Sequence, residues 1–207
     1  MRASLLFNLC YAVFKLVTGI LYSSVWFTGI AVYYITLCLM RFFLLHSLQK
    51  KDAKPLHEWR SYRICGVLLF VFSIALNGIV AQMIHSGKNY QYPGHLIYAM
   101  AAYAFYSVAS SIINLMRYRR FNSPVLSATK ILSLATALVA MLSLQTAMFN
   151  ALEGASRQMQ LIMNSATGGG VCLTIFGAAT YMVIHANIAI KAAQTNKEDV
   201  GNGPKRK

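Results

Sequence analysis

Hydrophobic residues occur in six long runs along the chain, and short polar segments separate them. The runs cover residues 4–22, 25–47, 64–84, 95–116, 124–149 and 167–190. Each has about the 20 residues that a helix needs to cross the hydrocarbon core of a membrane. Strands are disfavoured, because the runs lack period-2 alternation and an open sheet edge cannot be satisfied in lipid. The pattern predicts an all-α, polytopic integral membrane protein, with a six-helix transmembrane domain over residues 1–193 and a polar, disordered tail over residues 194–207.

Basic residues gather in the segments that lie on one side of this predicted bundle. They are Arg2, Lys50, Lys51, Lys54, Arg60, Arg63, Arg117, Arg119, Arg120, Lys191, Lys197, Lys205, Arg206 and Lys207. The loops on the opposite side, near residues 23–24, 85–94 and 150–166, contain only Lys88 and Arg157. Short cytoplasmic loops collect Lys and Arg. The sequence therefore predicts a multi-pass protein of the cell membrane with both termini in the cytoplasm.

The formal net charge of +14 raises the question of a nucleic-acid partner. The basic residues form no continuous face, and their placement at one set of helix ends is explained by membrane topology. We therefore expect anionic lipid headgroups as neighbours and no nucleic acid.

Polar residues inside the predicted spans fall on single helical faces when they are sorted by the i, i+3, i+4, i+7 rule. The first span has Asn8, Tyr11, Lys15, Thr18 and Tyr22; the fourth has Tyr103, Ser107, Ser110, Ser111 and Asn114; the fifth has Thr129, Ser133, Thr136 and Ser143. Such stripes either let helices pack closely through interhelical hydrogen bonds or line a solvated cavity. Both interpretations use the same residue types, so the pattern leaves both open.

Lys15 is the least expected residue in the first span. A lysine near the centre of a membrane helix costs about 2.5–3.5 kcal/mol on the insertion scale, which the apolar residues of this span outweigh. Helical rise puts it roughly 16 Å from the cytoplasmic start and 10 Å from the outer end, so its amine either extends to the outer surface or lies inside the bundle. Arg41 and Lys130 are each about 10 Å from the cytoplasmic ends of their helices, and for these two the extended arrangement is favoured.

Acidic residues are scarce and lie outside the spans. The five are Asp52, Glu58, Glu153, Glu198 and Asp199. Membrane sites for Zn²⁺, Mn²⁺ or Mg²⁺ use clustered Asp, Glu, His or Cys ligands, and the spans offer no carboxylate. No P-loop, G-x-S-x-G or H-E-x-x-H motif occurs either. The sequence thus predicts no catalytic residues, no cofactor and no metal site.

Two segments resemble a known family. The run NLCYAVFKLVTGILYSSV (8–25) is similar to the start of the transmembrane domain of cation diffusion facilitators, and FNSPVLSATKILSLAT (121–136) resembles the entry to that family's fifth helix. The resemblance implies a six-helix scaffold with cytoplasmic termini, and a homodimer. The family's metal ligands would fall on Thr129, Leu132 and Thr136, and on about Tyr33 and Leu37. None of these positions carries a metal ligand, and the family's cytoplasmic C-terminal domain is absent, so the resemblance implies a scaffold that has lost its metal site.

Two functions follow as hypotheses. The first is a transporter of a small solute or ion other than a divalent metal, which uses the polar stripes as its pathway and cationic residues to attract the substrate. Its candidate binding residues are Lys15, Asn8, Tyr11, Ser107, Ser111, Asn114, Thr129, Lys130, Ser133 and Thr136. The second is a non-transporting membrane subunit that binds a protein partner or lipid, in which the stripes are packing surfaces.

Overall fold

The fold was analysed in a computed structural model that describes residues 2–22, 25–49, 55–86, 94–117, 123–151 and 157–201. Its elements are α1 (Arg2–Leu21), α2 (Val25–Gln49), α3 (Pro55–Ser86), α4 (Gly94–Arg117), α5 (Pro124–Ala151) and α6 (Arg157–Gly201). No strand occurs in these ranges. The prediction of an all-helical chain with six helices is therefore confirmed for the part of the chain that the structure describes.

Five of the helices are long and apolar enough to cross a membrane. Their apolar stretches are Val25–His46, Glu58–Gln82, Leu96–Met116, Pro124–Phe149 and Gln158–Thr195, whereas the stretch in α1, Leu5–Leu21, is shorter. The apolar composition is that of a membrane-embedded protein. The number of crossings and the side on which the termini lie stay predictions.

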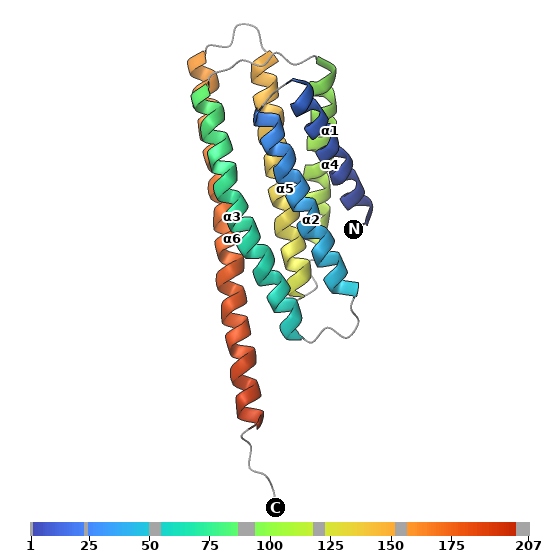
Figure 1. The fold of residues 1–207 in the computed structure, drawn as a ribbon, viewed down its shortest axis with the longest axis vertical. Helices are drawn as coiled ribbons and strands as arrows, with labels where there is room; N and C mark the ends of the chain where they lie inside the picture. Colours follow the sequence, from blue (N-terminus) through green and yellow to red (C-terminus); the bar gives the residue numbers. More distant parts are fainter. Residues whose placement is uncertain are drawn as a thin grey trace, which may run out of the picture.

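Successive helices run in opposite directions, and α6 extends well beyond the others at the end where the C-terminus lies (Figure 1). Helix α6 continues past Gln194 to Gly201. This differs from the sequence-based expectation of a disordered tail, because residues 194–201 are helical, and residues 202–207 lie outside the described residues.

Helix α5 begins at a serine–proline pair, Ser123 and Pro124, a pair of residues that favours a helix start. The carbonyl of Ser123 accepts the first helical hydrogen bond from the backbone N–H of Ser127, at 3.1 Å, and Pro124 is the first helical residue. This is the favoured use of proline, which has no N–H to leave unsatisfied. The Ser123 hydroxyl, however, donates to a carboxylate oxygen of Glu58 at 3.0 Å, so it ties the start of α5 to the start of α3.

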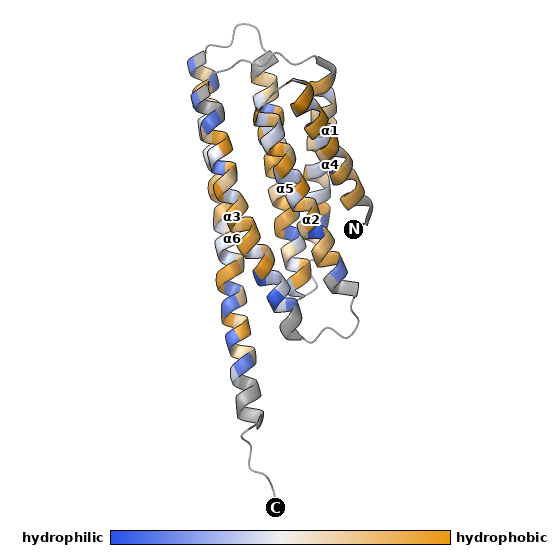
Figure 2. Cartoon of the chain, viewed as in Figure 1, coloured by the Kyte–Doolittle hydropathy of each residue, from blue (hydrophilic) through white to orange (hydrophobic). Residues whose placement is uncertain are grey.

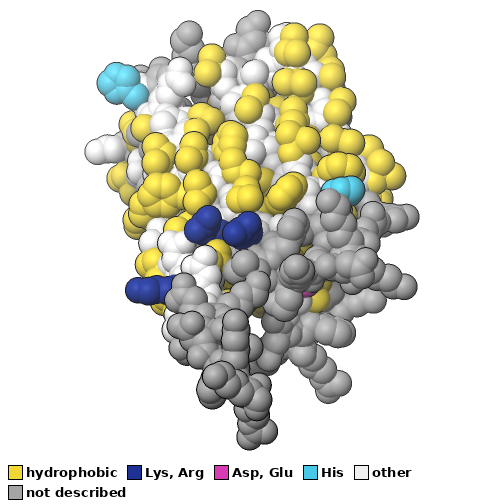
Figure 3. All heavy atoms as spheres, turned by 60° about the horizontal axis from the view of Figure 1, so that its bottom comes forward, with side chains coloured by type: hydrophobic (Ala, Val, Ile, Leu, Met, Phe, Trp, Pro, Cys, Tyr) yellow, Lys and Arg dark blue, Asp and Glu magenta, His cyan; other side chains and the backbone are white. Residues whose placement is uncertain are grey.

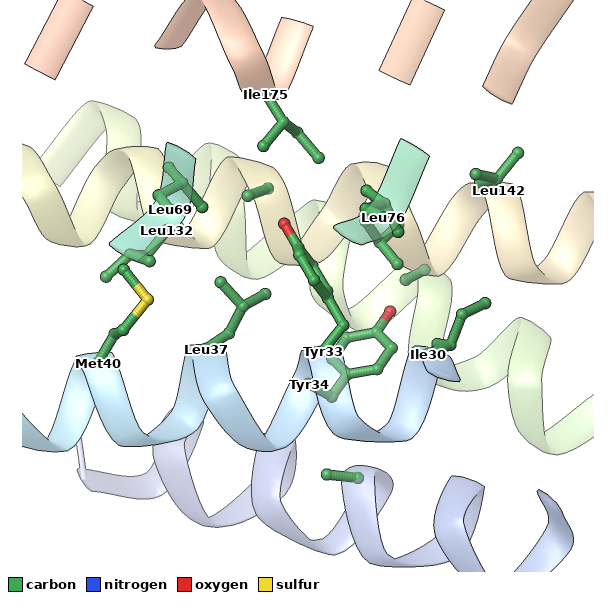
Figure 4. Packing of buried hydrophobic residues seen from close by; sticks show 14 of the residues in the cluster. Ile30, Tyr33, Tyr34, Leu37, Met40, Leu69, Leu76, Leu132, Leu142 and Ile175 are labelled. Atoms are coloured by element: carbon green, nitrogen blue, oxygen red, sulfur yellow. The ribbon is translucent and has the colours of Figure 1, made fainter. Parts of the chain in front are cut away.

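The helices form two groups. Helices α3 and α6 lie along each other over most of the length of α3, while α1 packs on α2 and α4 packs on α5. Contacts of α2 with α5 join the latter two pairs into a four-helix group of α1, α2, α4 and α5, and contacts of α3 with both α2 and α5 hold the groups together. Buried side chains from these elements converge on one core, as Figure 4 shows for Leu37 (α2), Leu69 (α3), Leu132 (α5) and Ile175 (α6).

The outside of the molecule is mainly apolar. Hydrophobic residues dominate the helices over most of their length, and hydrophilic ones are more frequent on the far part of α6 (Figure 2). In the space-filling view, Lys and Arg side chains gather at one border of a broad hydrophobic surface (Figure 3). Arg60, Arg63 and Lys191 are exposed basic residues on α3 and α6. An apolar surface with basic residues at one border is what a membrane-embedded helical bundle presents to lipid and headgroups.

Candidate functional site

Lys15 lies inside the four-helix group. Its side chain is 0% exposed, and its Nζ donates to the hydroxyl of Ser143 at 2.6 Å and to the thioether sulfur of Met100 at 2.8 Å. The same amine lies 3.9 Å from the centroid of the Phe27 ring and 5.6 Å from that of Tyr11. Contacts from four helices therefore surround it, and we name Lys15, Phe27, Met100 and Ser143 the lysine layer. Of the two placements that the sequence left open, the structure shows the inner one.

Three tyrosines lie next to the lysine layer, and we name Tyr11, Tyr34 and Tyr103 the tyrosine layer. The rings of Tyr11 and Tyr103 are stacked, with centroids 3.4 Å apart and planes 5° apart, and Tyr34 meets both edge-on, at 5.3 and 5.9 Å. The Tyr103 hydroxyl donates to the side-chain oxygen of Asn8 at 2.9 Å. All three rings are buried, so they close the interior of the group at this level.

A second buried cation lies beyond the tyrosines. Arg41 is 8% exposed, and its Nη2 donates to the hydroxyls of Ser133 at 3.0 Å and Thr136 at 3.3 Å. The side-chain amide of Asn114 also donates to the Ser133 hydroxyl, at 3.3 Å. We name Arg41, Asn114, Ser133 and Thr136 the arginine layer. The Tyr34 hydroxyl links it to the tyrosine layer by donating to the backbone carbonyl of Thr136 at 3.4 Å.

The three layers repeat along α2. Phe27, Tyr34 and Arg41 follow one another at intervals of about two helical turns, or roughly 10 Å each. Because such intervals bring residues back to the same helical face, one face of α2 contributes to all three layers. The interior of the four-helix group is thus a polar file in which two cationic side chains are separated by aromatic rings.

The predicted candidate residues fall into three sets. The structure brings together Asn8, Tyr11, Lys15, Asn114, Ser133 and Thr136, each of which belongs to a layer or contacts one. Ser107 and Ser111 are buried on α4 between Tyr103 and Asn114 in the sequence. Thr129 and Lys130 are only half-buried, and the Thr129 hydroxyl donates to the carbonyl of Val125 in its own helix.

The extended arrangement predicted for Arg41 is wrong. Its guanidinium contacts hydroxyls on α5 inside the group instead of extending along the lipid-facing surface. Hydropathy could not separate the two arrangements, because the insertion cost depends on depth and not on the direction of the side chain. A helical-face sort of α2 that included Phe27 and Tyr34 could have placed Arg41 on the inner face. For Lys130 the extended arrangement stays a prediction.

Sequence reasoning also missed Phe27, Tyr34 and Met100. Phe27 and Met100 carry no polar signal, so a search for polar stripes passes over them, and no polar stripe was assigned on the second span, which carries Tyr34. They are found only through their contacts, which are a cation–π contact, an edge-to-face ring pair and a hydrogen bond to sulfur.

Four helices supply the two buried cations and the partners described above. The sequences of α1, α2, α4 and α5 contain neither Asp nor Glu. Glu58 lies at the start of α3 and accepts from Ser123, and Asp52 and Glu153 lie outside the described residues. In the ranges that the structure describes, no group of three His, Cys, Asp or Glu residues could hold a metal ion. Lys15 donates to a hydroxyl and a thioether sulfur and lies over two ring faces, and Arg41 donates to two hydroxyls.

No protein-family model, curated protein or solved structure matches the chain. The resemblance to cation diffusion facilitators therefore stays a prediction.

Proposed function

We propose that the chain is a multi-pass protein of the cell membrane whose six helices all cross the bilayer, with both termini in the cytoplasm. The exposed apolar side chains along the helices and the basic residues at one border of the hydrophobic surface support this arrangement. Helix α1 is short for a span, but it packs along α2 and contributes Lys15 to the interior. A helix with that role in the bundle has to lie at the same membrane depth as its neighbours.

Within this bundle, the four-helix group binds and conducts a small polar or anionic solute, other than a divalent metal ion, along the file of layers. The observation that carries this function is the complete burial of Lys15 among neutral partners. A buried cation is costly when no opposite charge balances it, and ionisable residues at membrane depth commonly mark substrate or ion pathways. The tyrosine layer is then the closed barrier between a solute site at Lys15 and one at Arg41.

Lys15→Met tests this function, because methionine keeps an unbranched side chain and removes the amine. We expect solute uptake by the purified protein in liposomes, measured across a panel of small anions and neutral polar solutes, to fall at least tenfold. Lys191→Met is the matched control, since Lys191 is exposed on α6, outside the four-helix group. Uptake that is equal in the wild type and Lys15→Met would contradict the assigned role of the lysine.

The second candidate function is a non-transporting membrane subunit that binds a protein partner or lipid. It is favoured by the tight packing of the tyrosine layer, in which the stacked Tyr11 and Tyr103 rings leave no space between them. In that case the polar layers hold the helices together through hydrogen bonds and have no solute to bind.

Water accessibility separates the two functions. Ser107→Cys and Thr136→Cys place thiols on α4 and α5, at two buried positions of the four-helix group, in a chain whose four native cysteines are replaced. A transport pathway that opens exposes both thiols to a small water-soluble reagent in the membrane. A permanently packed interior leaves both thiols unreactive and favours the subunit. Lipid and a second copy of the chain are the proposed partners in either case.

A further inference from the structure

A groove of about 500 Å³ lies on the outside of the bundle, where α1, α2 and the end of α3 come together. Its volume is within the range of about 300–1,000 Å³ that is usual for ligand sites. Helix α1 and helix α3 both pack on α2, so α2 forms the floor of the groove and the other two helices form its walls. It is lined by Gly19 and Ile20 of α1, by Val25, Gly29 and Val32 of α2, and by Ile79 of α3.

Close contacts between the helices set the shape of the groove. A Cβ added to Gly19 would lie 2.8 Å from the backbone N of Thr28, so α1 and α2 meet there at backbone distance. A Cβ added to Gly29 would lie 2.9 Å from Cδ1 of Ile79, so the side chain from α3 lies directly against the floor. Because backbone atoms fix the α1–α2 approach, side-chain rearrangement does not close the groove from that side.

The groove runs along the helices. Its α2 residues Val25, Gly29 and Val32 lie on one helical face, and the helix rises roughly 10 Å between the first and the last of them. The hydrocarbon core of a bilayer is about 30 Å thick, so this length covers most of one leaflet. The α1–α2 turn lies at the end of the bundle opposite the C-terminus (Figure 1), and the groove therefore faces the leaflet on that side.

The lining is suited to an apolar occupant. Among the described residues, it contains no charged side chain. Its members Ile20, Val25 and Val32 are exposed, so the groove is continuous with the apolar surface that the helices present to lipid. Inside a bilayer, packing and not the hydrophobic effect selects what binds between helices, and wall atoms without a neighbour lose their dispersion contacts. An acyl chain restores those contacts without needing a hydrogen bond, and it extends along the same direction as the helices.

We propose that this groove binds one acyl chain of a membrane phospholipid, in the leaflet opposite the C-terminus. The inference rests on the membrane placement given in the proposed function and does not depend on transport. The chain fills the space between α1 and α3 on the surface of α2, so it joins α1, the helix with the shortest apolar stretch, to the rest of the bundle.

Native mass spectrometry of the full-length protein released from detergent micelles tests the groove with palmitoyl-oleoyl phosphatidylcholine as the probe. This headgroup carries no net charge, so the basic residues at the border of the bundle attract it little. We expect saturable binding of one phospholipid per chain. Val32→Trp fills the groove with an indole ring and should weaken this binding about tenfold, because the ring takes the place of several methylenes of the lipid.

Val71→Trp is the matched control, since Val71 on α3 is 54% exposed, compared with 49% for Val32, and does not line the groove. It should bind the phospholipid as the wild type does. Equal affinity in the wild type and Val32→Trp would overturn the proposal. Should Val32→Trp fail to fold, Ile20→Trp fills the groove from α1, with the exposed Ile74→Trp on α3 as its control. Unchanged phospholipid binding in Ile20→Trp would contradict the site in the same way.

Other occupants give different results in the same measurement. A groove that takes a sterol would give cholesterol binding that Val32→Trp abolishes, together with phospholipid binding that it leaves unchanged. A groove that takes a second copy of the chain would give a dimer that Val32→Trp dissociates, again with unchanged phospholipid binding. Either result would overturn the assignment to an acyl chain.

The failure of this proposal can be told apart from the failure of the proposed function. Phospholipid binding that Val32→Trp weakens, without solute uptake into liposomes, would support the groove and contradict transport. Solute uptake, with phospholipid binding that Val32→Trp leaves unchanged, would support transport and contradict the groove. A wild-type protein that does not float with liposomes in a density gradient would contradict the membrane placement and, with it, the groove proposal.

Discussion

The two helix groups are packed through different kinds of contact between helices. In the α3–α6 pair, backbones approach closely, because a Cβ added to Gly66 would lie 3.0 Å from the Cβ of Met182. The buried hydroxyl of Ser73 in this pair donates to the carbonyl of Phe70 in its own helix at 2.7 Å. In the four-helix group, by contrast, buried polar side chains bind across helices, through Lys15 and Arg41. A close approach at Gly66 joins α3 to α6, whereas cation–hydroxyl contacts, along with a close approach of Gly19 to Thr28, join the helices of the four-helix group.

The largest loss of stability should come from adding a side chain at the point where α3 and α6 approach closely. Gly66→Leu adds a side chain against Met182 and against the backbone N of Val183, neither of which can move without displacing α6. We expect a loss of about 3 kcal/mol in the free energy of unfolding, measured by denaturant titration of the solubilised protein. Gly78→Leu is the control, since nothing lies within 4 Å of a Cβ at that position, and it should change stability little. Equal losses in both variants would show that the pair does not depend on this contact.

The second-largest loss of stability is expected when the cation–hydroxyl contact of the four-helix group is removed. Ser143→Ala removes one of the two hydrogen-bond acceptors of the Lys15 amine and should cost about 2 kcal/mol in the same titration, because a hydrogen bond to a charged group is lost inside the protein. Ser73→Ala, in the other group, removes only a bond within one helix and should cost less than about 1 kcal/mol.

A double variant at Lys15 and Ser143 isolates the contribution of this contact to stability. In Lys15→Met the buried amine is gone, so adding Ser143→Ala to that variant should cost much less than it does in the wild type. If Ser143→Ala costs the same with and without Lys15, the contact between them contributes nothing to stability.

A smaller effect is expected within the tyrosine layer. Tyr103→Phe removes the hydrogen bond to Asn8 and leaves the buried amide oxygen without that donor. The loss should be about 1 kcal/mol, and ring stacking with Tyr11 should persist. Near-ultraviolet circular dichroism reports the ring packing, and denaturant titration the stability. An unchanged free energy of unfolding would mean that the Asn8 contact is replaced by another.

The smallest effect should have the opposite sign. The hydroxyl of Tyr33 on α2 is buried without a hydrogen-bond partner among the described residues. Tyr33→Phe removes this unsatisfied group, so we expect a gain of up to about 1 kcal/mol in the same titration. A loss of stability would indicate that the Tyr33 hydroxyl has a partner after all and would make this residue comparable to Tyr103.

Much of the site could be anticipated from the helical faces. The stripe of the first span placed Asn8, Tyr11 and Lys15 together, and that of the fifth placed Ser133, Thr136 and Ser143 together. Thr129 was assigned to the same stripe but is only half-buried, and its hydroxyl donates to the carbonyl of Val125 within α5. A helical-face rule gives the direction of a side chain, and it cannot give the neighbour that the side chain meets.

The sequence by itself determined the six helices, the start of α5 at Pro124 and the absence of acidic residues from four of the helices, because length, hydropathy and capping residues act within one segment. Only the tertiary structure decided that Lys15 lies inside, that Arg41 is buried against Ser133 and that tyrosine rings separate them. Those outcomes depend on which helices pack together. That choice is made by contacts between segments far apart in the chain, and no periodicity within a single segment records it.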